Sequence, residues 1–271
     1  MDLIDSHCHL DASEFDPDRT AVLDRARHAG VSQQVVPAVT AASWPKLKEV
    51  CAQDRGLYPA YGLHPMFLPE HRPAHLDTLR QWIERECPRA IGECGLDYFV
   101  DGLDRDAQAH YFEGQLRLAH DFDLPVIVHA RRAVDAVLAA IRRFAPLRGV
   151  VHSFSGSRQQ AEQLWDQGFL VGLGGPVTYE RAQRLRTLAA TMPIEYLLLE
   201  TDAPDQPDAE IRGQRNEPAR LTHVLATIAR LRDESPDTVA EATRRNAERL
   251  FNLPARGPHR PPATRRAPGW A

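Results

Sequence analysis

The sequence predicts an α/β fold, a TIM-type (β/α)8 barrel formed by a single domain with an extra C-terminal helix. Eight short apolar runs alternate with amphipathic stretches along the 271 residues, which makes a parallel sheet the expected arrangement. The runs recur at intervals of roughly 25–35 residues, the length that one strand–helix unit requires. No G-x-G-x-x-G pattern follows an early run, which argues against an open, doubly wound sheet.

The apolar runs give the strands, and helical periodicity gives the segments between them. Val134, Val137, Leu138 and Ile141, for example, recur at the spacing of one helix face. The predicted strands are Leu3–His7, Gln34–Ala38, Leu57–Gly62, Ala90–Glu93, Pro125–His129, Val150–Ser153, Phe169–Leu173 and Tyr196–Glu200. The predicted helices between them are Arg19–Ala29, Trp44–Cys51, His75–Glu86, Ala107–Asp121, Val134–Phe144, Arg158–Gln167 and Glu180–Ala190.

Two more helices are expected after the last strand, around Ala219–Arg232 and Pro236–Phe251. Ser235 followed by Pro236 is a favourable N-cap and first helical residue for the second of them. The barrel is therefore predicted to span residues 1–254. Residues 255–271 are rich in Pro and Arg, which predicts a flexible tail.

Composition excludes several classes of protein. The sequence contains no run of 18 apolar residues, so no membrane span is predicted. The N-terminus also lacks a signal-peptide pattern, so we expect a cytoplasmic protein. None of the four cysteines forms a C-x-x-C pair, which argues against a thiolate zinc site. A net charge of -4 argues against a broad basic face for duplex DNA. No obligate protein partner is indicated.

The pair His7 and His9 is the first sign of a metal site. If both lie on the first strand, their imidazoles point to the same side and could share a metal ion. Asp5 has the same parity and could orient a ligand from behind. Taken alone, this pair is as readily explained by two unrelated histidines.

Residues of metal-ligand type also stand at the ends of four later strands: Glu93, His129, His152 and Asp202. The carboxyl ends of barrel strands meet at one mouth, where active sites of this fold are found. Four imidazoles and two carboxylates exceed the needs of one catalytic ion, so two divalent cations are expected. Imidazole-rich sites suit Zn²⁺, Mn²⁺ or Ni²⁺, and Mg²⁺ is a further candidate.

Two bound cations close together need a bridging anion. The chain has only two lysines, Lys46 and Lys48, and both fall on a predicted surface helix. A carbamylated lysine therefore cannot form the bridge, which leaves the carboxylate of Glu93.

The ordered set of motifs resembles the TatD-type deoxyribonucleases of the amidohydrolase superfamily, from about Met1 to Leu253. The motifs are Asp5-Ser6-His7-Cys8-His9, Gly62-Leu63-His64-Pro65, Gly92-Glu93-Cys94-Gly95-Leu96-Asp97, His129-Ala130-Arg131, His152-Ser153-Phe154-Ser155-Gly156, Glu200-Thr201-Asp202-Ala203-Pro204 and Arg215-Asn216-Glu217-Pro218.

The resemblance implies a role for each residue. His7 and His9 would bind one metal, and His129 and His152 the second, with Glu93 between them. Asp202 would bind the first metal and accept a proton from water, while His64 would lie near the scissile phosphate and Glu200 would support the site. Cys94 stands where the family more often has Ile or Thr, which changes a neighbour of the bridge and no ligand.

Two arginines are candidate phosphate contacts, because a planar guanidinium matches phosphate oxygens. Arg131 follows His129, and Arg215 lies in the loop after the eighth strand. A surface salt bridge is an equally good explanation for either. Gly172–Gly175 is a weak phosphate-binding signal, for which a tight turn is the better explanation.

The residues alone predict metal-dependent hydrolysis, and the resemblance adds the substrate. The leading function is removal of nucleotides from the ends of single-stranded DNA, with RNA as an alternative substrate. A second function is amide, lactam or ester hydrolysis at the same centre, since an activated water can attack carbon as well as phosphorus. A third is a barrel kept only as an RNA-binding scaffold, against which the presence of all six ligands argues.

Overall fold

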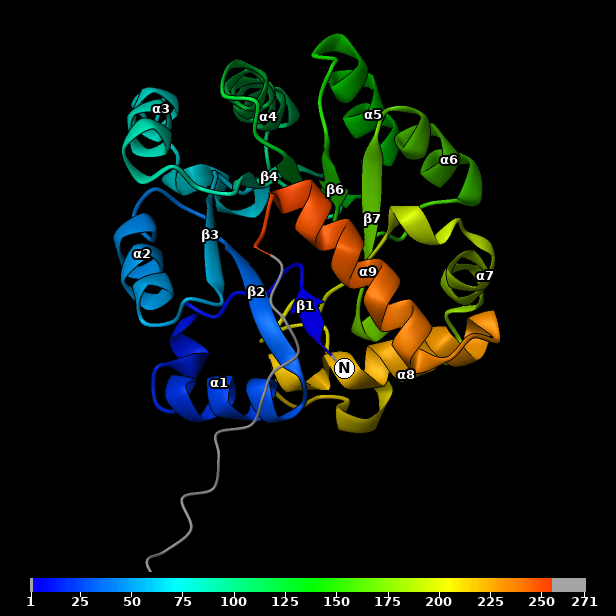
Figure 1. Cartoon of the computed structure of the whole chain (residues 1–271). Helices are drawn as coiled ribbons and strands as arrows, with labels where there is room; N and C mark the ends of the chain where they lie inside the picture. The colour runs from blue at the N-terminus through cyan, green and yellow to red at the C-terminus, as the bar shows by residue number, and fades with distance from the viewer. Residues whose placement is uncertain (1, 255–271) are drawn as a thin grey trace, which may run out of the picture.

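The computed structural model describes residues 2–254, in which eight parallel strands form one sheet in the order of the sequence. Ser6 N–H donates to the Leu199 carbonyl (3.0 Å) and Asp202 N–H to the His7 carbonyl (2.9 Å), so the first and last strands meet. The predicted TIM-type barrel is therefore confirmed (Figure 1). Its strands are β1 (Leu3–Asp5), β2 (Val31–Pro37), β3 (Leu57–Tyr61), β4 (Ala90–Asp97), β5 (Val126–Arg131), β6 (Gly149–Val151), β7 (Phe169–Leu173) and β8 (Leu197–Leu199).

Helices surround the barrel and cover the outer face of its sheet (Figure 1). Their apolar faces pack on the strands, as in the helix that carries Val134, Val137 and Ile141, all buried. The helices are α1 (Arg19–His28), α2 (Trp44–Ala52), α3 (Ala74–Glu86), α4 (Arg105–Asp121), α5 (Val134–Arg143), α6 (Arg158–Asp166), α7 (Gln183–Thr191), α8 (Leu221–Arg232) and α9 (Pro236–Phe251).

The helix α9 closes the end of the barrel at which the strands begin. Leu250 and Phe251 join the apolar side chains that fill the barrel interior, among them Ile4, Val35, Ala60, Ala90, Ile127, Val150, Leu170 and Leu198. The Asn246 side-chain amide donates to the carbonyls of Ile194 (2.7 Å) and Leu197 (2.9 Å), at the start of β8. Figure 1 shows α9 crossing in front of the strands. The other end of the barrel, where the strands finish, is not covered by α9.

Several strand boundaries differ from the prediction, and the differences in β1 and β4 bear on the site. β1 ends at Asp5, so His7 and His9 follow the strand and do not lie on it. β4 continues to Asp97, which places Glu93 within the strand, where the pairing with β5 shifts between Ile91 and Cys94. Gly95 makes the longer strand possible. Its φ is +142°, and a Cβ there would lie 2.1 Å from the His129 carbonyl oxygen.

Two helices also begin later than predicted. α7 begins at Gln183 and not at Glu180, and α8 begins at Leu221 because residues Pro218–Arg220 form a short 3-10 turn before it. No helix within residues 2–254 is long and apolar enough to cross a membrane. The predicted Pro- and Arg-rich tail, 255–271, lies outside the described residues.

Candidate metal centre

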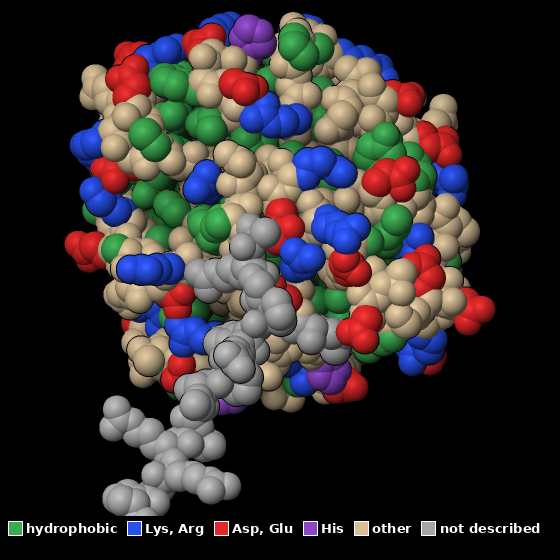
Figure 2. Space-filling model, in the orientation of Figure 1, with side chains coloured by type: hydrophobic (Ala, Val, Ile, Leu, Met, Phe, Trp, Pro, Cys, Tyr) green, Lys and Arg blue, Asp and Glu red, His purple; other side chains and the backbone are tan. Residues whose placement is uncertain are grey.

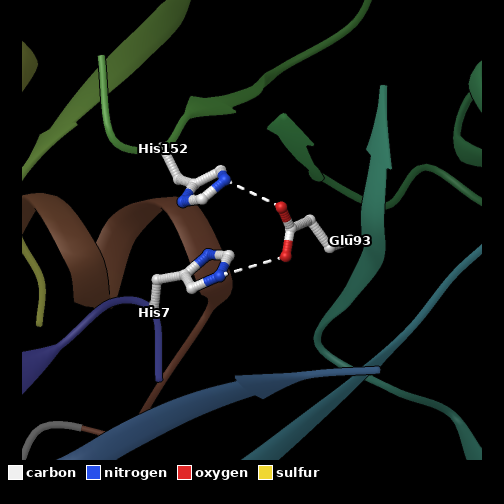
Figure 3. A group of neighbouring side chains, drawn as sticks. All are labelled: His7, Glu93 and His152. Atoms are coloured by element: carbon white, nitrogen blue, oxygen red, sulfur yellow. Dashed lines mark ion pairs between the residues drawn. The ribbon is translucent and has the colours of Figure 1, made fainter. Parts of the chain in front are cut away.

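The six predicted ligands meet around the carboxylate of Glu93. Its Oε2 lies 3.2 Å from His7 Nε2 and 3.4 Å from His9 Nε2. Its Oε1 lies 2.7 Å from His152 Nε2 and 3.2 Å from His129 Nδ1. Figure 3 shows His7 and His152 each pointing at a different oxygen of the same carboxylate. Glu93 thus has one oxygen for each of two imidazole pairs, as a bridging anion requires.

The carboxylate of Asp202 completes the group around His7 and His9. Its Oδ1 lies 3.3 Å from His7 Nε2 and 3.5 Å from His9 Nε2. The side-chain amide of Gln206 donates to the other oxygen, Oδ2. Asp202 adopts a φ of +56°, an uncommon backbone conformation for a residue other than glycine. It follows β8, so the loop after the strand carries the ligand to the mouth.

Hydrogen bonds decide which imidazole nitrogen of two ligands faces the centre. His9 Nδ1 donates to the Pro37 carbonyl (3.1 Å), which leaves Nε2 unprotonated in the neutral ring. His129 Nε2 donates to Asp97 Oδ2 (2.9 Å), which leaves Nδ1 facing Glu93. A carboxylate behind a histidine in this way is typical of metal ligands. Asp97 also accepts hydrogen bonds from the N–H groups of Phe99 (2.8 Å) and Val100 (3.0 Å).

Asp5 fixes the two chain segments that carry the predicted ligands His7 and Asp202. Its Oδ1 accepts the N–H of His7 (3.2 Å) and of Thr201 (3.0 Å), and its Oδ2 accepts the Thr201 hydroxyl. Burial raises the pKa of Asp5 to about 7, although these hydrogen bonds oppose the shift. Asp5 therefore orients His7 and the segment that leads to Asp202 through the backbone, without contacting an imidazole.

Glu200 lies behind His152, outside the cavity. Its Oε1 accepts the N–H of Ser153 and lies 3.9 Å from His152 Nδ1. A Cβ at position 172 would lie 2.0 Å from Glu200 Oε2, so Gly172 gives the carboxyl group its space. Burial raises the pKa of Glu200 to about 8. Glu200 is thus a positioning residue behind His152.

His64 donates a hydrogen bond to Glu93, and it also lies with Glu93 and His129 in a group whose ligand-type atoms are within 4.8 Å of one another. Its Nδ1 accepts the N–H of Met66 (3.2 Å), so the proton of the neutral ring sits on Nε2. Nε2 lies 2.8 Å from Glu93 Oε1 and donates to it. Burial lowers the pKa of His64, which keeps the ring neutral. The side chain also lines the cavity described below.

The donor set fits divalent cations. One ligand atom each from His7, His9 and Asp202 lies within 4.8 Å of the others, and so does one each from His7, Glu93 and His152. Neutral imidazole and carboxylate are ligands for Zn²⁺, Mn²⁺ or Ni²⁺. The buried Nδ1 atoms of His7 and His152 have no hydrogen-bond partner within residues 2–254, and their rings stack 3.9 Å apart.

Buried negative charge dominates the electrostatics of the centre. Burial opposes ionisation of Glu93, but the imidazoles of His64, His152 and His7 hold its pKa well below the usual range. Asp202 is likewise buried, and its hydrogen bond with His9 lowers its pKa to about 2. Burial opposes charge on His152, but Glu93 raises its pKa to about 9. The two ionised carboxylates therefore favour a positive charge inside the cluster. A bound divalent cation can supply that charge in place of a protonated imidazole.

A cavity of about 920 Å³ opens over this cluster at the mouth of the barrel. His9, His64, Glu93, His129, His152 and Asp202 all contribute to its lining, and so does the predicted phosphate contact Arg131. Arg215 is placed differently. Its guanidinium forms a two-point ion pair with Asp18 (both 2.8 Å), and the residue is not part of the lining. The alternative of a surface salt bridge therefore describes Arg215.

Some residues around the site had no signal in the sequence. Gln206 contacts Asp202 and the Ser153 hydroxyl (2.7 Å) from a loop without periodicity. Met66 and Phe67 line the cavity with side chains 43% and 36% exposed. Two exposed apolar residues in a short segment resemble an ordinary turn, so only the fold shows that they flank the centre.

Comparison with known proteins agrees with this geometry. The family model described as TatD related DNase matches residues 4–252. The uncharacterized metal-dependent hydrolase YjjV of Escherichia coli K12 is 42% identical over 254 residues, covering 93% of this chain and 98% of that protein. The 3'-5' ssDNA/RNA exonuclease TatD of Erwinia tasmaniensis is 35% identical over 263 residues, covering 93% of this chain and all of that protein.

Solved structures give the same relationship. The crystal structure of the YjjV TatD homologue from E. coli K12 matches with a TM-score of 0.89 at 41% identity, covering 93% of this chain and 98% of that chain. A TatD family hydrolase from Entamoeba histolytica shares the fold, with a TM-score of 0.82 at 21% identity over 92% of this chain and 98% of that chain. From the match across nearly the whole chain, we conclude that the protein belongs to the TatD-related DNase family of metal-dependent hydrolases.

Proposed function

We propose that the protein removes nucleotides from the ends of single-stranded DNA, with a centre of two divalent cations held by His7, His9, Glu93, His129, His152 and Asp202. The observation that carries the proposal is the Glu93 carboxylate, each oxygen of which faces a different pair of imidazoles. Relatives that are 33–35% identical over 93% of this chain are named 3'-5' ssDNA/RNA exonucleases, which supports a strand end as the substrate.

The protein residues would divide the reaction among themselves. When bound, the cations supply Lewis acidity toward a phosphate and lower the pKa of water. The Asp202 carboxylate, kept ionised by its hydrogen bond with His9, would accept the proton of the attacking water. His64 would hold the Glu93 carboxylate through its Nε2–H and would lie near the scissile phosphate, because its side chain lines the same cavity.

Arg131 would hold the phosphate from the rim. Its guanidinium lies 3.7 Å from the centre of the exposed Phe99 ring and forms no ion pair with a carboxylate of residues 2–254. An arginine that is ordered by an aromatic ring and has no acidic partner can present its N–H groups to phosphate oxygens. The positions of Arg131 at the end of β5 and of His129 two residues earlier place both at the same mouth.

Duplex DNA is a poor fit to this arrangement. The net charge is -4, which argues against a broad basic surface. The face covered by α9, at the end of the barrel away from the centre, shows basic and acidic side chains interspersed (Figure 2). Binding along a duplex relies on many Lys and Arg contacts to phosphates. A concave mouth, lined among residues 2–254 by Arg131 without an acidic partner, instead suits the end of a single strand.

A panel assay tests the proposal. The protein, loaded with Mg²⁺, Mn²⁺ or Zn²⁺, is given single-stranded DNA, RNA, duplex DNA, a simple ester and a lactam. We expect single strands to be shortened from one end, and chelation to abolish the activity. Hydrolysis of the lactam or ester with no shortening of either nucleic acid would replace this proposal with the amide or ester alternative, which uses the same centre.

A further inference from the structure

The cavity has two sides of opposite character. On one side, Asp11, Glu14 and Asp205 line it, and none of the three forms an ion pair within residues 2–254. On the other side, the lining contains Arg131 and the exposed side chains of Met66 and Phe67. The metal-ligating cluster lies between them.

The barrel topology places these two sides across from each other. Asp11 and Glu14 follow β1, and Asp205 follows β8, which meets β1 where the sheet closes. Met66 and Phe67 follow β3, and Arg131 ends β5. In a sheet of eight strands in sequence order, β3 to β5 lie opposite the junction of β8 and β1.

A nucleic-acid strand carries one negative charge at each internal phosphate, whereas a terminal nucleoside with a free hydroxyl carries none. The internal phosphates are therefore attracted to Arg131 and repelled by the carboxylates of Asp11, Glu14 and Asp205. Phe67, packed 5.9 Å from the His64 ring and 36% exposed, adds a flat apolar surface on the same side for an unpaired base. The terminal nucleoside alone can lie on the acidic side without repulsion.

We propose that the cavity recognises strand ends by charge: the internal chain lies over Phe67 and Arg131, and the terminal nucleoside lies against Asp11, Glu14 and Asp205. This inference rests on the proposed nuclease function and narrows its substrate to strands that end in a hydroxyl. A terminal phosphate would add between one and two negative charges beside the carboxylates. An internal site would do the same, because the chain would have to continue across the acidic side.

The test compares two linear single strands of one sequence, one with hydroxyl groups at both ends and one with phosphate groups at both ends. We expect the phosphate-ended strand to be shortened at least about tenfold more slowly, since like charges repel strongly at a protein surface. The ratio should shrink in high salt, which screens exposed charges. Equal rates on the two strands would overturn the inference.

A double variant assigns the effect to the carboxylates. Glu14→Gln with Asp205→Asn should bring the ratio of the two rates toward one and should allow slow cutting of a closed circular strand. The matched control, Glu49→Gln with Asp77→Asn, removes two exposed charges from the outer helices α2 and α3 and should keep the ratio.

The outcomes distinguish a failure of the charge mechanism from a failure of the nuclease function. An unchanged ratio in the Glu14 and Asp205 double variant would overturn the charge mechanism while leaving the nuclease function in place. Failure of the unmodified, metal-loaded protein to shorten the hydroxyl-ended strand would instead refute the nuclease function, and the inference with it.

Discussion

The Glu93 carboxylate shows how much one residue contributes to this centre. Its position in the chain, the types of its neighbours and the absence of a suitable lysine already indicate a bridging role. The sequence could not show that His64 also contacts it, at 2.8 Å, because that contact depends on the path of the loop after β3. Nor could it show that Asp97 orients His129, since β4 was expected to end four residues earlier.

Replacing Glu93 by Gln tests the bridge without changing side-chain size. The variant loses the negative charge and one of the two oxygens, so we expect metal content to fall from two ions per chain to one or fewer. Turnover should fall roughly 100-fold or more, since even changes behind metal ligands cost 10–100-fold. Metal analysis of the purified protein checks this, with Glu49→Gln as a control at an exposed carboxylate. Two ions at full occupancy in the variant would refute the bridge.

Asp202→Asn removes the proposed proton acceptor while keeping its shape. The amide cannot take the proton from the attacking water, so turnover should fall by about 10²–10⁴-fold, the usual contribution of a general base. The thermal midpoint and metal content are measured alongside turnover. Near-normal turnover with both metals bound would remove Asp202 from this role.

The raised pKa of His152, about 9, predicts how pH acts on the metal-free protein. A histidine whose pKa is higher in the folded state than in the unfolded state stabilises the fold below about pH 6.5. That contribution is lost as pH rises from about 6.5 to about 9. Denaturant unfolding of chelator-treated protein should therefore show a falling free energy of unfolding across this window.

Metal-loaded protein should behave in the opposite way, because a cation requires the neutral imidazole and binds more tightly as pH rises. Calorimetry in buffers of different ionisation enthalpy should detect protons released when the metal binds near pH 7. Binding without proton release would show that His152 and its neighbours are already neutral.

At the scale of elements, the order of strands and helices was predictable, but several ends were not. The run Arg89–Gly92 reads as a strand that stops at Glu93, whereas β4 continues because Gly95 lets it approach β5. His7 and His9 converge to 3.2 Å between their Nε2 atoms, although β1 has already ended. The residue pattern identified the ligands correctly as neighbours, while strand alternation was the wrong reason for it.

The position of α9 also could not be predicted, because helical periodicity shows that a face is apolar and not what it covers. Phe251 is 1% exposed and packs among the residues that fill the barrel interior. Phe251→Ala should lower the free energy of unfolding by about 3–5 kcal/mol. Turnover at 25 °C should stay near normal, because α9 and the metal centre lie at opposite ends of the barrel.

Denaturant unfolding and initial rates check this prediction together, with Phe251→Leu as the milder replacement. A large loss of turnover in a fully folded Phe251→Ala protein would mean that the two ends of the barrel are coupled.

At the scale of the whole molecule, the barrel has a charged, concave mouth at one end, and the apolar face of α9 packs on the other end. Net charge and composition predicted that no long basic face would be found, but not the unequal sides of the cavity. Asp11, Glu14 and Asp205 come from loops after the first and last strands, and closure of the sheet alone brings them together. Arg215, a candidate phosphate contact by sequence, is held by Asp18 instead.

We propose above that a metal-dependent centre at the barrel mouth acts on the ends of single strands. The most direct test of this proposal is the rate of degradation of a closed circular single strand beside a linear strand of the same sequence, with metal and after chelation. We expect rapid metal-dependent shortening of the linear strand and a circle that remains intact. Degradation of the circle as fast as the linear strand would contradict the proposal.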